Sequence, residues 1–322
     1  MQAMTPPTAA TTTAPRPVRT DAPESGEDHY PSRMNRPPEL LRRRHPVVHE
    51  GGRGPLDPAS VRRFDERGFL NMQNVFSAEE VQALDRAVSD LVDQLTSRME
   101  EAETAKRLVI EPRANDIRSI FSFHDEPGPL QDVIADDRLA GVARQLLASD
   151  VYVHQSRVNR KPGFRGDDFG WHSDFETWHT EDGMPRMRAL SCSVLLTPNH
   201  TFNGPLLTID GSHEHFVSCQ GETPVDNYQQ SLRRQDLGVP DDASLRELVR
   251  RGRINECLGQ PGTVVFFDCN VMHGSNGNIT PNERHNVFLV YNSVTNALEE
   301  PFAAPTRRPE FIASRDVRPI HV

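Results

Sequence analysis

The chain is 322 residues long and carries a formal net charge of −10 at pH 7. This length permits one large domain with an ample core, and the acidic balance argues against a nucleic-acid-binding protein. The sequence has no apolar run of the roughly 18 residues that a membrane helix needs, and its four cysteines show no CxxC pairing, so we expect a cytoplasmic protein without structural zinc, disulfides or a membrane partner.

The first 58 residues are dense in Pro, Thr, Arg and Gly and poor in large apolar side chains. Such a composition cannot bury enough surface to offset the entropy that is lost on ordering. We predict a Pro-rich N-terminal extension over residues 1–58, disordered over 1–40 and able to lie along the domain over 41–58. The folded domain is then expected over residues 59–322.

The first part of the folded domain is predicted to supply scaffold rather than site. Ser77 and Glu80 form a capping-box pattern, and an apolar stripe at helical spacing follows them. The predicted elements of this part are a short helix that ends at Gly68, a strand over 69–76, a helix from Ser77 to about Arg98, a strand over 116–123 and a helix around 139–147.

From Asp150 onward the pattern changes to short β-rich runs separated by Gly, Pro, Asn and Asp. The polar stretch over 221–252 is expected to form a long excursion with one helix over 243–250. Short strands with turn signals, and helices gathered in the N-terminal third, favour a mainly β fold with flanking helices, built as a sandwich or closed barrel. The predicted strands are 151–159, 169–174, 189–197, 206–210, 262–268 and 285–293.

His172 and Asp174 are the first candidates for a functional site, because they lie two residues apart in the predicted strand over 169–174. In an extended strand, residues i and i+2 project from the same face, so an imidazole and a carboxylate could each give one ligand to the same metal ion. The same pair also suits a surface strand with two polar residues that face solvent. A metal site needs a third ligand from elsewhere.

His273 is the candidate for that third ligand. It follows the apolar run over 264–268 at the end of a strand, and Arg284 opens the next apolar strand. An HxD pair, a distant His and an Arg shortly after it match the 2-His-1-carboxylate triad of non-haem Fe(II) oxygenases. Such a triad leaves coordination positions open for a chelating co-substrate and O₂.

Other polar residues compete for this role. His213 and His215 form an HxH pair that could bind a metal, but the preceding residues favour a turn and no third ligand is near in sequence. Glu176 could share a face with Asp174; because a second carboxylate beside the iron would add repulsion, we expect it to turn away. Asp167 and its neighbour Asp168 receive no role from the sequence.

The stretch Phe169–Ser191, FGWHSDFETWHTEDGMPRMRALS, resembles the signature segment of the ectoine hydroxylases. These enzymes belong to the phytanoyl-CoA-hydroxylase-like Fe(II)/2-oxoglutarate dioxygenases. The wider likeness covers about residues 60–300, including Asn203–Leu206 and Asp210–His213. It implies a double-stranded β-helix (jelly-roll, cupin-like) core and a homodimer in the cytoplasm.

The resemblance also implies an activity, the hydroxylation of ectoine at ring carbon 5 coupled to conversion of 2-oxoglutarate and O₂ to succinate and CO₂. The iron ligands would be His172, Asp174 and His273. The 2-oxoglutarate positions of the family fall on Phe121, Gln155, Asn159, Ser275 and Arg284. Its ectoine positions fall on Gln155, Arg157, Thr177, Trp178, Ala189, Phe267 and Phe288.

The chemistry of these residue types agrees with the implied roles. The planar guanidinium of Arg284 can hold the distal carboxylate of 2-oxoglutarate in a bidentate pair. Arg157 can hold the carboxylate of ectoine, and the ring of Trp178 can face its amidinium. Phe267 and Phe288 would bound the ring and exclude water.

Three rival functions stay open at this point. The first is the same chemistry on another small polar substrate, such as an amino acid, which the residues after Asp174 disfavour. A halogenase is disfavoured because Asp174 occupies the position that chloride would need. The third rival is a non-catalytic jelly-roll protein with a structural divalent metal, against which Arg284 and the open coordination face argue.

Overall fold

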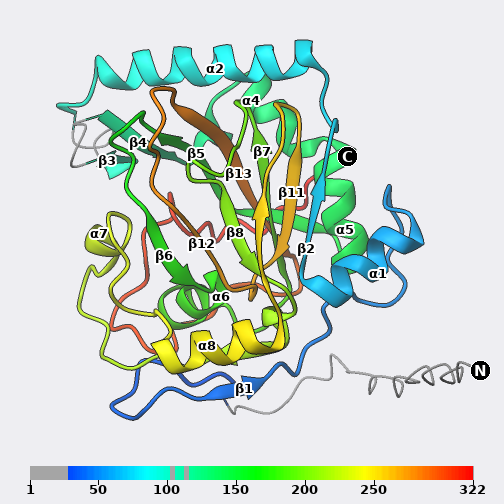
Figure 1. Ribbon diagram of the computed structural model, residues 1–322, viewed down its shortest axis with the longest axis vertical. Coiled ribbons are helices and arrows are strands. Elements are labelled where there is room, and N and C mark those ends of the chain that lie inside the picture. The colour runs from blue at the N-terminus through cyan, green and yellow to red at the C-terminus, as the bar shows by residue number, and fades with distance from the viewer. Residues whose placement is uncertain (1–27, 102–105, 112–115, 322) are drawn as a thin grey trace, which may run out of the picture.

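The computed structural model describes residues 28–101, 106–111 and 116–321. Within them, the strands form three antiparallel sheets: a large sheet in the order β2-β11-β7-β13-β5-β4-β3, a smaller sheet in the order β10-β8-β12-β6, and the pair β1-β9. The two larger sheets face each other (Figure 1). Residues of both sheets line a common cavity. The predicted mainly β fold with a jelly-roll core is confirmed.

Each predicted strand is present, and the described residues form five further short strands that the sequence analysis did not predict, namely β1, β3, β9, β10 and β12. The strands of the large sheet are β2 (Phe69–Met72), β3 (Leu108–Glu111), β4 (Asp116–Phe121), β5 (Val151–Lys161), β7 (Ala189–Leu195), β11 (Val264–Asp268) and β13 (Arg284–Ser293). The other strands are β6 (Phe169–His172), β8 (Leu206–Ile209), β10 (Ile254–Cys257), β12 (His273–Ser275), β1 (Leu40–Arg42) and β9 (His215–Val217). The helices are α1 (Pro58–Arg67), α2 (Ala78–Thr96), α4 (Pro129–Asp132), α5 (Val142–Leu147), α6 (Asp174–Thr177), α7 (Tyr228–Ser231) and α8 (Asp242–Arg251).

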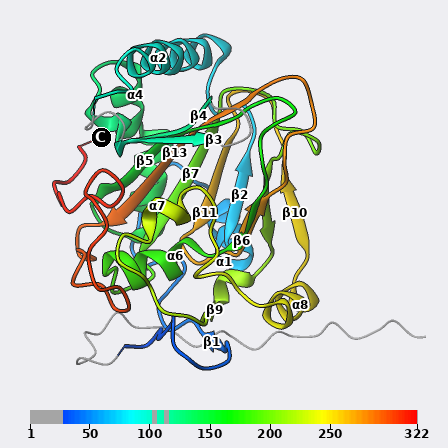
Figure 2. The same ribbon diagram turned by 90° about the vertical axis from the view of Figure 1, so that its left-hand side faces the viewer.

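The chain crosses between the two larger sheets after nearly every strand from β5 to β13. Residues from β5, β11 and β13 of one sheet and from β6 and β12 of the other therefore reach the same cavity. In Figure 2, the large-sheet strands β5, β13, β7 and β11 lie beneath α2. This alternation is why residues far apart in sequence can form one site.

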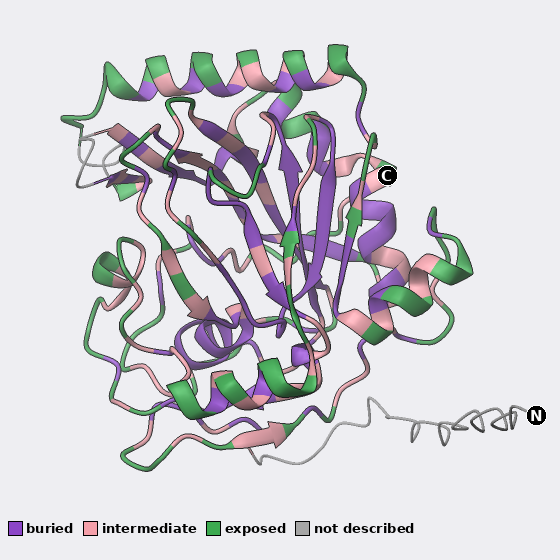
Figure 3. Ribbon diagram, viewed as in Figure 1, coloured by how far each residue is buried: buried purple, intermediate pink, exposed green. Residues whose placement is uncertain are grey.

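Helices cover the sheets, and their ends follow local sequence signals. The capping box predicted at Ser77 is present, since the Ser77 hydroxyl accepts from Glu80 N–H and the Glu80 carboxylate accepts from Ser77 N–H. Helix α2 buries one apolar stripe in the main core and exposes its other face (Figure 3). Gly68 closes α1 in the left-handed conformation with φ 81°. No helix in the described part of the chain is both long and apolar enough to cross a bilayer.

The described residues outside the N-terminal third contain more helices than expected. The predicted helix over 243–250 is present as α8, but the short helices α6 and α7 were not predicted. Periodicity cannot reveal helices of four residues, because they show little more than one turn of the pattern.

The N-terminal segment packs on the domain from residue 28 onward, which corrects the predicted boundary at residue 58. Tyr30 is only 1% exposed and meets the rings of Phe175 and Phe216. Arg33 is buried among carboxylates, and β1 pairs with β9. The composition of this segment did not predict its order, because buried polar contacts hold much of it against the domain and apolar burial contributes less. The rest of the predicted extension, residues 1–27, lies outside the described residues.

Candidate active site

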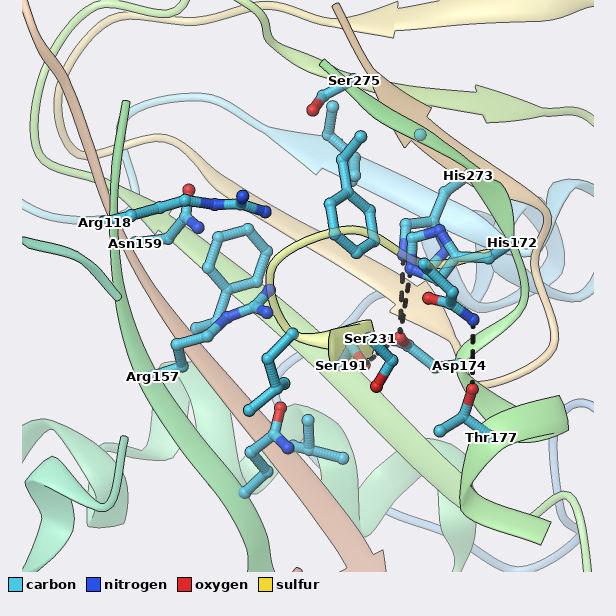
Figure 4. A pocket seen from close by; sticks show the side chains of 18 of the residues that line it. Arg118, Arg157, Asn159, His172, Asp174, Thr177, Ser191, Ser231, His273 and Ser275 are labelled. Atoms are coloured by element: carbon cyan, nitrogen blue, oxygen red, sulfur yellow. Dashed lines mark hydrogen bonds and ion pairs between the residues drawn. The ribbon is translucent and has the colours of Figure 1, made fainter. Parts of the chain in front are cut away.

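Three candidate metal ligands meet at one side of the cavity. His172 ends β6, Asp174 begins α6 and His273 begins β12, and the pairing of β6 with β12 places the two histidines opposite each other. Asp174 Oδ1 lies 3.7 Å from His172 Nε2 and 3.8 Å from His273 Nε2 (Figure 4). The three ligand atoms lie within 4.8 Å of one another, so one metal ion can bridge them.

The local structure around Asp174 differs from the predicted strand. The strand ends at His172, and Asp174 is the first residue of α6. The Phe175 N–H donates to the carbonyl of Cys269 at 2.8 Å, which secures the start of that helix. The HxD pair therefore converges through a strand-to-helix turn, not through the alternation of an extended strand.

Both imidazoles are oriented for metal binding. The Nδ1 of His172 donates to Gly170 O at 2.9 Å, and the Nδ1 of His273 donates to Val271 O at 3.0 Å. A carbonyl can only accept, so each Nε2 presents its lone pair to the common point. Burial, with the neighbouring His273, lowers the pKa of His172 to about 3. This ring stays neutral, and the donor set fits Fe(II).

Arg284 marks the second functional part of the cavity. Its Nη1 donates to Gly204 O and its Nη2 to Asn159 Oδ1, both at 2.6 Å. No carboxylate among the described residues pairs with it, its Nε has no hydrogen-bond partner there, and burial lowers its pKa to about 10. A buried guanidinium without an anion is costly, so this position favours an anionic ligand.

Lys161 lies beside Arg284 and was missed by the sequence analysis. Its Nζ donates to Ser275 Oγ at 2.9 Å and to Asn276 O at 2.5 Å. Because the Ser275 hydroxyl accepts from Lys161, its own proton can donate into the cavity. Burial, with the nearby Arg284, lowers the pKa of Lys161 to about 6.

Arg157 lies across the cavity from the metal ligands (Figure 4). Its guanidinium lies 5.1 Å from the ring centroid of Phe288 and 5.8 Å from that of Phe121. Its Nε has no hydrogen-bond partner in the described part of the chain, and burial lowers its pKa to about 10. Arg157 is thus a second buried cation with capacity for an anion.

Thr177 and Trp178 form the wall that follows the metal ligands. The Thr177 hydroxyl accepts from Gln235 Nε2 at 3.2 Å, the contact drawn at Thr177 in Figure 4. The Trp178 ring meets His154 edge-on at 5.1 Å between centroids. His154 in turn lies 3.4 Å from Asp182, so buried polar groups support the indole from behind.

The cavity includes most but not all of the predicted site residues. Phe121 and Ala189 do not line it: Phe121 packs with Val109 and Ile312, and Ala189 belongs to the apolar cluster behind Trp178. The predicted residues that do line it are Gln155, Arg157, Asn159, His172, Asp174, Thr177, Trp178, Phe267, His273, Ser275, Arg284 and Phe288.

Several cavity residues carried no usable sequence signal. Arg118 on β4 lies over the Phe169 ring at 5.4 Å and donates to Arg233 O at 2.9 Å, in a contact that only the fold creates. Asp167, left without a role above, lines the cavity, and its place directly before the signature could have indicated this. The other lining residues that were missed are Glu111, Arg160, Lys161, Ser191, Leu206, Ser231, Leu232, Gln235, Gly274, Val290 and Arg308.

The competing residues have other partners. His213 is buried and its Nε2 donates to Asp65 O at 3.1 Å, while His215 Nε2 lies 2.7 Å from Arg251 Nη1. Glu176 turns away from the metal position, as expected, and pairs with Arg33.

Comparison with known proteins places this site in a family. The family model for phytanoyl-CoA dioxygenase (PhyH) matches residues 64–286. The chain belongs to the phytanoyl-CoA dioxygenase family. The ectoine dioxygenase of Sphingopyxis alaskensis is 51% identical to this chain over 291 residues. The match covers 90% of this chain and 94% of the relative. The ectoine dioxygenase of Halomonas elongata is 47% identical, with 91% of this chain and 87% of the relative covered.

A solved structure of a related protein is similar to this chain over most of its length. The crystal structure of EctD from S. alaskensis with 2-oxoglutarate and 5-hydroxyectoine matches with a TM-score of 0.79 and 48% identity. The match covers 90% of this chain and 95% of that one. Sequence and fold therefore point to the same relatives.

Proposed function

We propose that this protein hydroxylates ectoine to 5-hydroxyectoine while it converts 2-oxoglutarate and O₂ to succinate and CO₂. It is a non-haem Fe(II)- and 2-oxoglutarate-dependent dioxygenase. The observation that carries the proposal is a single cavity that joins a His-Asp-His cluster to buried arginines without carboxylate partners among the described residues. Its similarity to a protein crystallised with 2-oxoglutarate and 5-hydroxyectoine supports this substrate.

His172, Asp174 and His273 would hold the iron, and the iron supplies the activation of O₂ when it is bound. The protein contributes the orientation of the ligands. The two backbone carbonyls fix the histidine tautomers, and Ser191 Oγ donates to Asp174 Oδ2 at 3.3 Å, which directs Oδ1 toward the histidines. Three ligands on one side leave the cavity side for substrates.

Arg284 would bind the distal carboxylate of 2-oxoglutarate, with Ser275 as a second donor. Asn159 holds the guanidinium in place, and Lys161 donates to the serine at a position where a bound carboxylate would favour the ammonium form of the lysine. A dianion satisfies the charge of this part of the cavity, where described cations lack carboxylate partners. The physical chemistry of the site therefore agrees with the family positions for this co-substrate.

Ectoine, a cyclic amidinium that carries a carboxylate, would occupy the space between Arg157 and Trp178. Arg157 supplies the anion partner that the carboxylate needs, and Trp178 offers its ring to the amidinium. Thr177 adds a hydroxyl whose proton can donate to a ligand, because its oxygen accepts from Gln235. Phe267 and Phe288 give the cavity apolar walls. Gln155 keeps its own contact, donating to Ile312 O at 2.8 Å.

The oligomeric state and the location in the cell are also proposals. A homodimer in the cytoplasm is what the likeness to ectoine hydroxylases implies. Light scattering on the purified full chain tests the dimer: a mass of one chain across the working concentration range would contradict it.

The decisive experiment is mass spectrometry of the reaction of the purified enzyme with ectoine, Fe(II), 2-oxoglutarate and O₂. A product of ectoine mass plus one oxygen, with the hydroxyl placed at ring carbon 5 by NMR, supports the proposal. Release of succinate without any oxygenated ectoine would contradict it.

Two further arms of this experiment separate the rival functions. With free proline in place of ectoine, substrate-driven succinate release would favour an amino-acid hydroxylase. With Zn(II) in place of Fe(II), a dioxygenase releases no succinate. Absence of succinate with either metal would favour the non-catalytic binding protein.

A further inference from the structure

A buried ion cluster lies directly behind the wall formed by Thr177 and Trp178. Arg33 donates from Nε and Nη2 to the two carboxylate oxygens of Glu176, at 3.1 and 2.9 Å. Its Nη1 donates to Glu181 Oε1 at 2.5 Å. All three side chains are at most 2% exposed. One guanidinium thus joins two buried carboxylates.

The two carboxylates flank the substrate wall in sequence. Glu176 directly precedes Thr177 in α6, and Glu181 lies in the π-helical turn Trp178–Asp182. Helix α6 has only four residues, too few for a stable helix on its own hydrogen bonds. Contacts from outside must therefore hold Thr177 and Trp178 in place, and Arg33 supplies them on both sides.

The same cluster holds the segment that covers the cavity. Arg33 Nη1 also donates to Thr223 Oγ1 at 3.1 Å, and Asn227 Nδ2 donates to Glu181 Oε1 at 2.8 Å. This segment continues to Gln235, which lines the cavity and donates to Thr177. The cluster therefore connects the N-terminal segment, the substrate wall and the segment over residues 223–235.

Hydrogen bonds to Cys219, which lies just before that segment, fix the backbone at Arg33. The Arg33 N–H donates to Cys219 O at 2.7 Å, and the Ser32 hydroxyl accepts from Cys219 N–H at 2.9 Å. Ser32 also donates to Glu176 Oε1 at 2.7 Å. These hydrogen bonds fix the position of Arg33, so its guanidinium contacts Glu176 and Glu181 at the same time.

We propose that Arg33 is a positioning residue for substrate recognition, which acts by holding Thr177 and Trp178 against the bound substrate. This inference rests on the function proposed above. Arg33 does not line the cavity or reach the reacting atoms. Its effect is on the geometry of the substrate half, while the co-substrate half around Arg284 is built from β5, β12 and β13, to which Arg33 makes no described bond.

The test is Arg33→Lys in the full-length enzyme. Lysine keeps the charge but cannot bond both carboxylates through a fixed fork. Because small displacements of positioning groups have large kinetic effects, we expect the KM for ectoine to rise about tenfold or more and the KM for 2-oxoglutarate to stay within about twofold. More 2-oxoglutarate should be consumed per hydroxyectoine formed. Calorimetry without O₂ should show a matching loss of ectoine affinity.

Arg43→Lys is the matched control. Arg43 is also a buried arginine of the N-terminal segment, uses all three of its nitrogens, and pairs with Asp268 at 2.7 Å. It has no described bond to Glu176, Thr177 or Glu181. We expect a comparable loss of thermal stability with an ectoine KM within about twofold of the parent enzyme.

A second variant keeps the inference testable if Arg33→Lys does not fold. Glu181→Gln removes one charge at nearly constant shape, so it should raise the ectoine KM in the same direction by a smaller factor. Unchanged ectoine affinity in a folded Arg33→Lys, an equal rise of both KM values, or the same change in Arg43→Lys would overturn the proposal. If the parent enzyme itself makes no hydroxyectoine, the proposed function has failed instead.

Discussion

Two buried arginines face the cavity with different surroundings, and this difference predicts different roles. Arg284 is held by Asn159 and a backbone carbonyl, so its direction is fixed before any ligand arrives. Arg157 lies near two aromatic rings, and its Nε has no hydrogen-bond partner among the described residues. A fixed guanidinium suits the invariant co-substrate, and a less constrained one suits the substrate.

Exchange of each arginine for alanine should therefore affect a different KM. Arg284→Ala should cost roughly 2–5 kcal/mol of co-substrate binding, about 30-fold or more in affinity, because it leaves a buried carboxylate unpaired. Arg157→Ala should raise the KM for ectoine and leave that for 2-oxoglutarate nearly unchanged. Steady-state kinetics with each substrate varied separately measures both. The same KM rising in both variants would contradict the assignment.

The metal ligands give the second prediction at this scale. His172→Ala, Asp174→Ala or His273→Ala should each abolish succinate release and lower the iron content of the protein, which atomic absorption measures. Each change removes one of the three side chains that would bind the iron. His215→Ala serves as the control, since this histidine belongs to the competing HxH pair and faces Arg251. Full activity in any of the three ligand variants would show that the ligand set is wrong.

At the scale of single residues, sequence could identify groups whose chemistry is visible in a motif. His172, Asp174, His273 and Arg284 were found in this way, and the structure brings them to one cavity. Lys161 could not be found, because a lysine in a β strand looks solvent-exposed until a cavity is seen beside it. Burial is a property of the fold, and burial together with the nearby Arg284 and Arg118 lowers the pKa of Lys161.

Among elements, the π-helical turn after Trp178 depends on the glycine that ends it. Gly183 has φ 80°, and a Cβ there would lie 2.3 Å from the carbonyl oxygen of Glu299. The Gly183 carbonyl also accepts from Glu299 N–H at 2.8 Å. The turn that carries Trp178 is thus locked against the segment that follows β13.

Gly183→Ala should lower the free energy of unfolding by at least about 2 kcal/mol, since it adds a backbone clash to the cost of positive φ. Gly51→Ala is the matched control, because Gly51 has φ 86° but nothing lies within 4 Å of its would-be Cβ. That variant should lose only about 1 kcal/mol. Urea denaturation measures the free energy of unfolding of both variants. If the two variants lose the same amount, the clash at residue 183 is relieved without an energetic cost.

Elements were predicted well where one local signal decides them, and less well where distant contacts do. The capping box at Ser77 fixes the start of α2, and the apolar run over 264–268 gives β11. By contrast, the turn at Asp174 depends on Cys269 and the order of residues 28–39 depends on Glu176 and Cys219, all far away in sequence. A sequence pattern that spans a few neighbouring residues cannot include partners so far away along the chain.

For the molecule as a whole, the distribution of charge matters more than its sum. The chain carries a net charge of −10, yet basic side chains outnumber the acidic Glu111, Asp167 and Asp174 in its cavity. The basic lining residues are Arg118, Arg157, Arg160, Lys161, Arg284 and Arg308. The buried arginines therefore form a local site of positive charge that favours a dianion. Net charge argued against nucleic acid as a partner but could not reveal this local excess of positive charge.

The same concentration of buried cations should couple co-substrate binding to protons. Burial, with Arg284 and Arg118, lowers the pKa of Lys161 from 10.5 to about 6, and Asp168 and Glu111 only partly oppose this. Between these two values the unfolded chain binds more protons at this group than the folded protein. Without co-substrate, the contribution of Lys161 to the free energy of unfolding therefore rises with pH from about 6 to 10.5.

Binding of 2-oxoglutarate places a carboxylate next to Lys161 and should raise its pKa, because an opposite charge favours the ammonium form. At pH 7.5, above the lowered value, binding should then take up a proton. Calorimetric titration of the Fe(II) enzyme without O₂, in buffers that differ in ionisation enthalpy, measures this uptake as a dependence of the binding heat on the buffer. Lys161→Met should bind more weakly and show less uptake. A buffer-independent heat in the parent enzyme would mean that Lys161 is already charged before the co-substrate arrives.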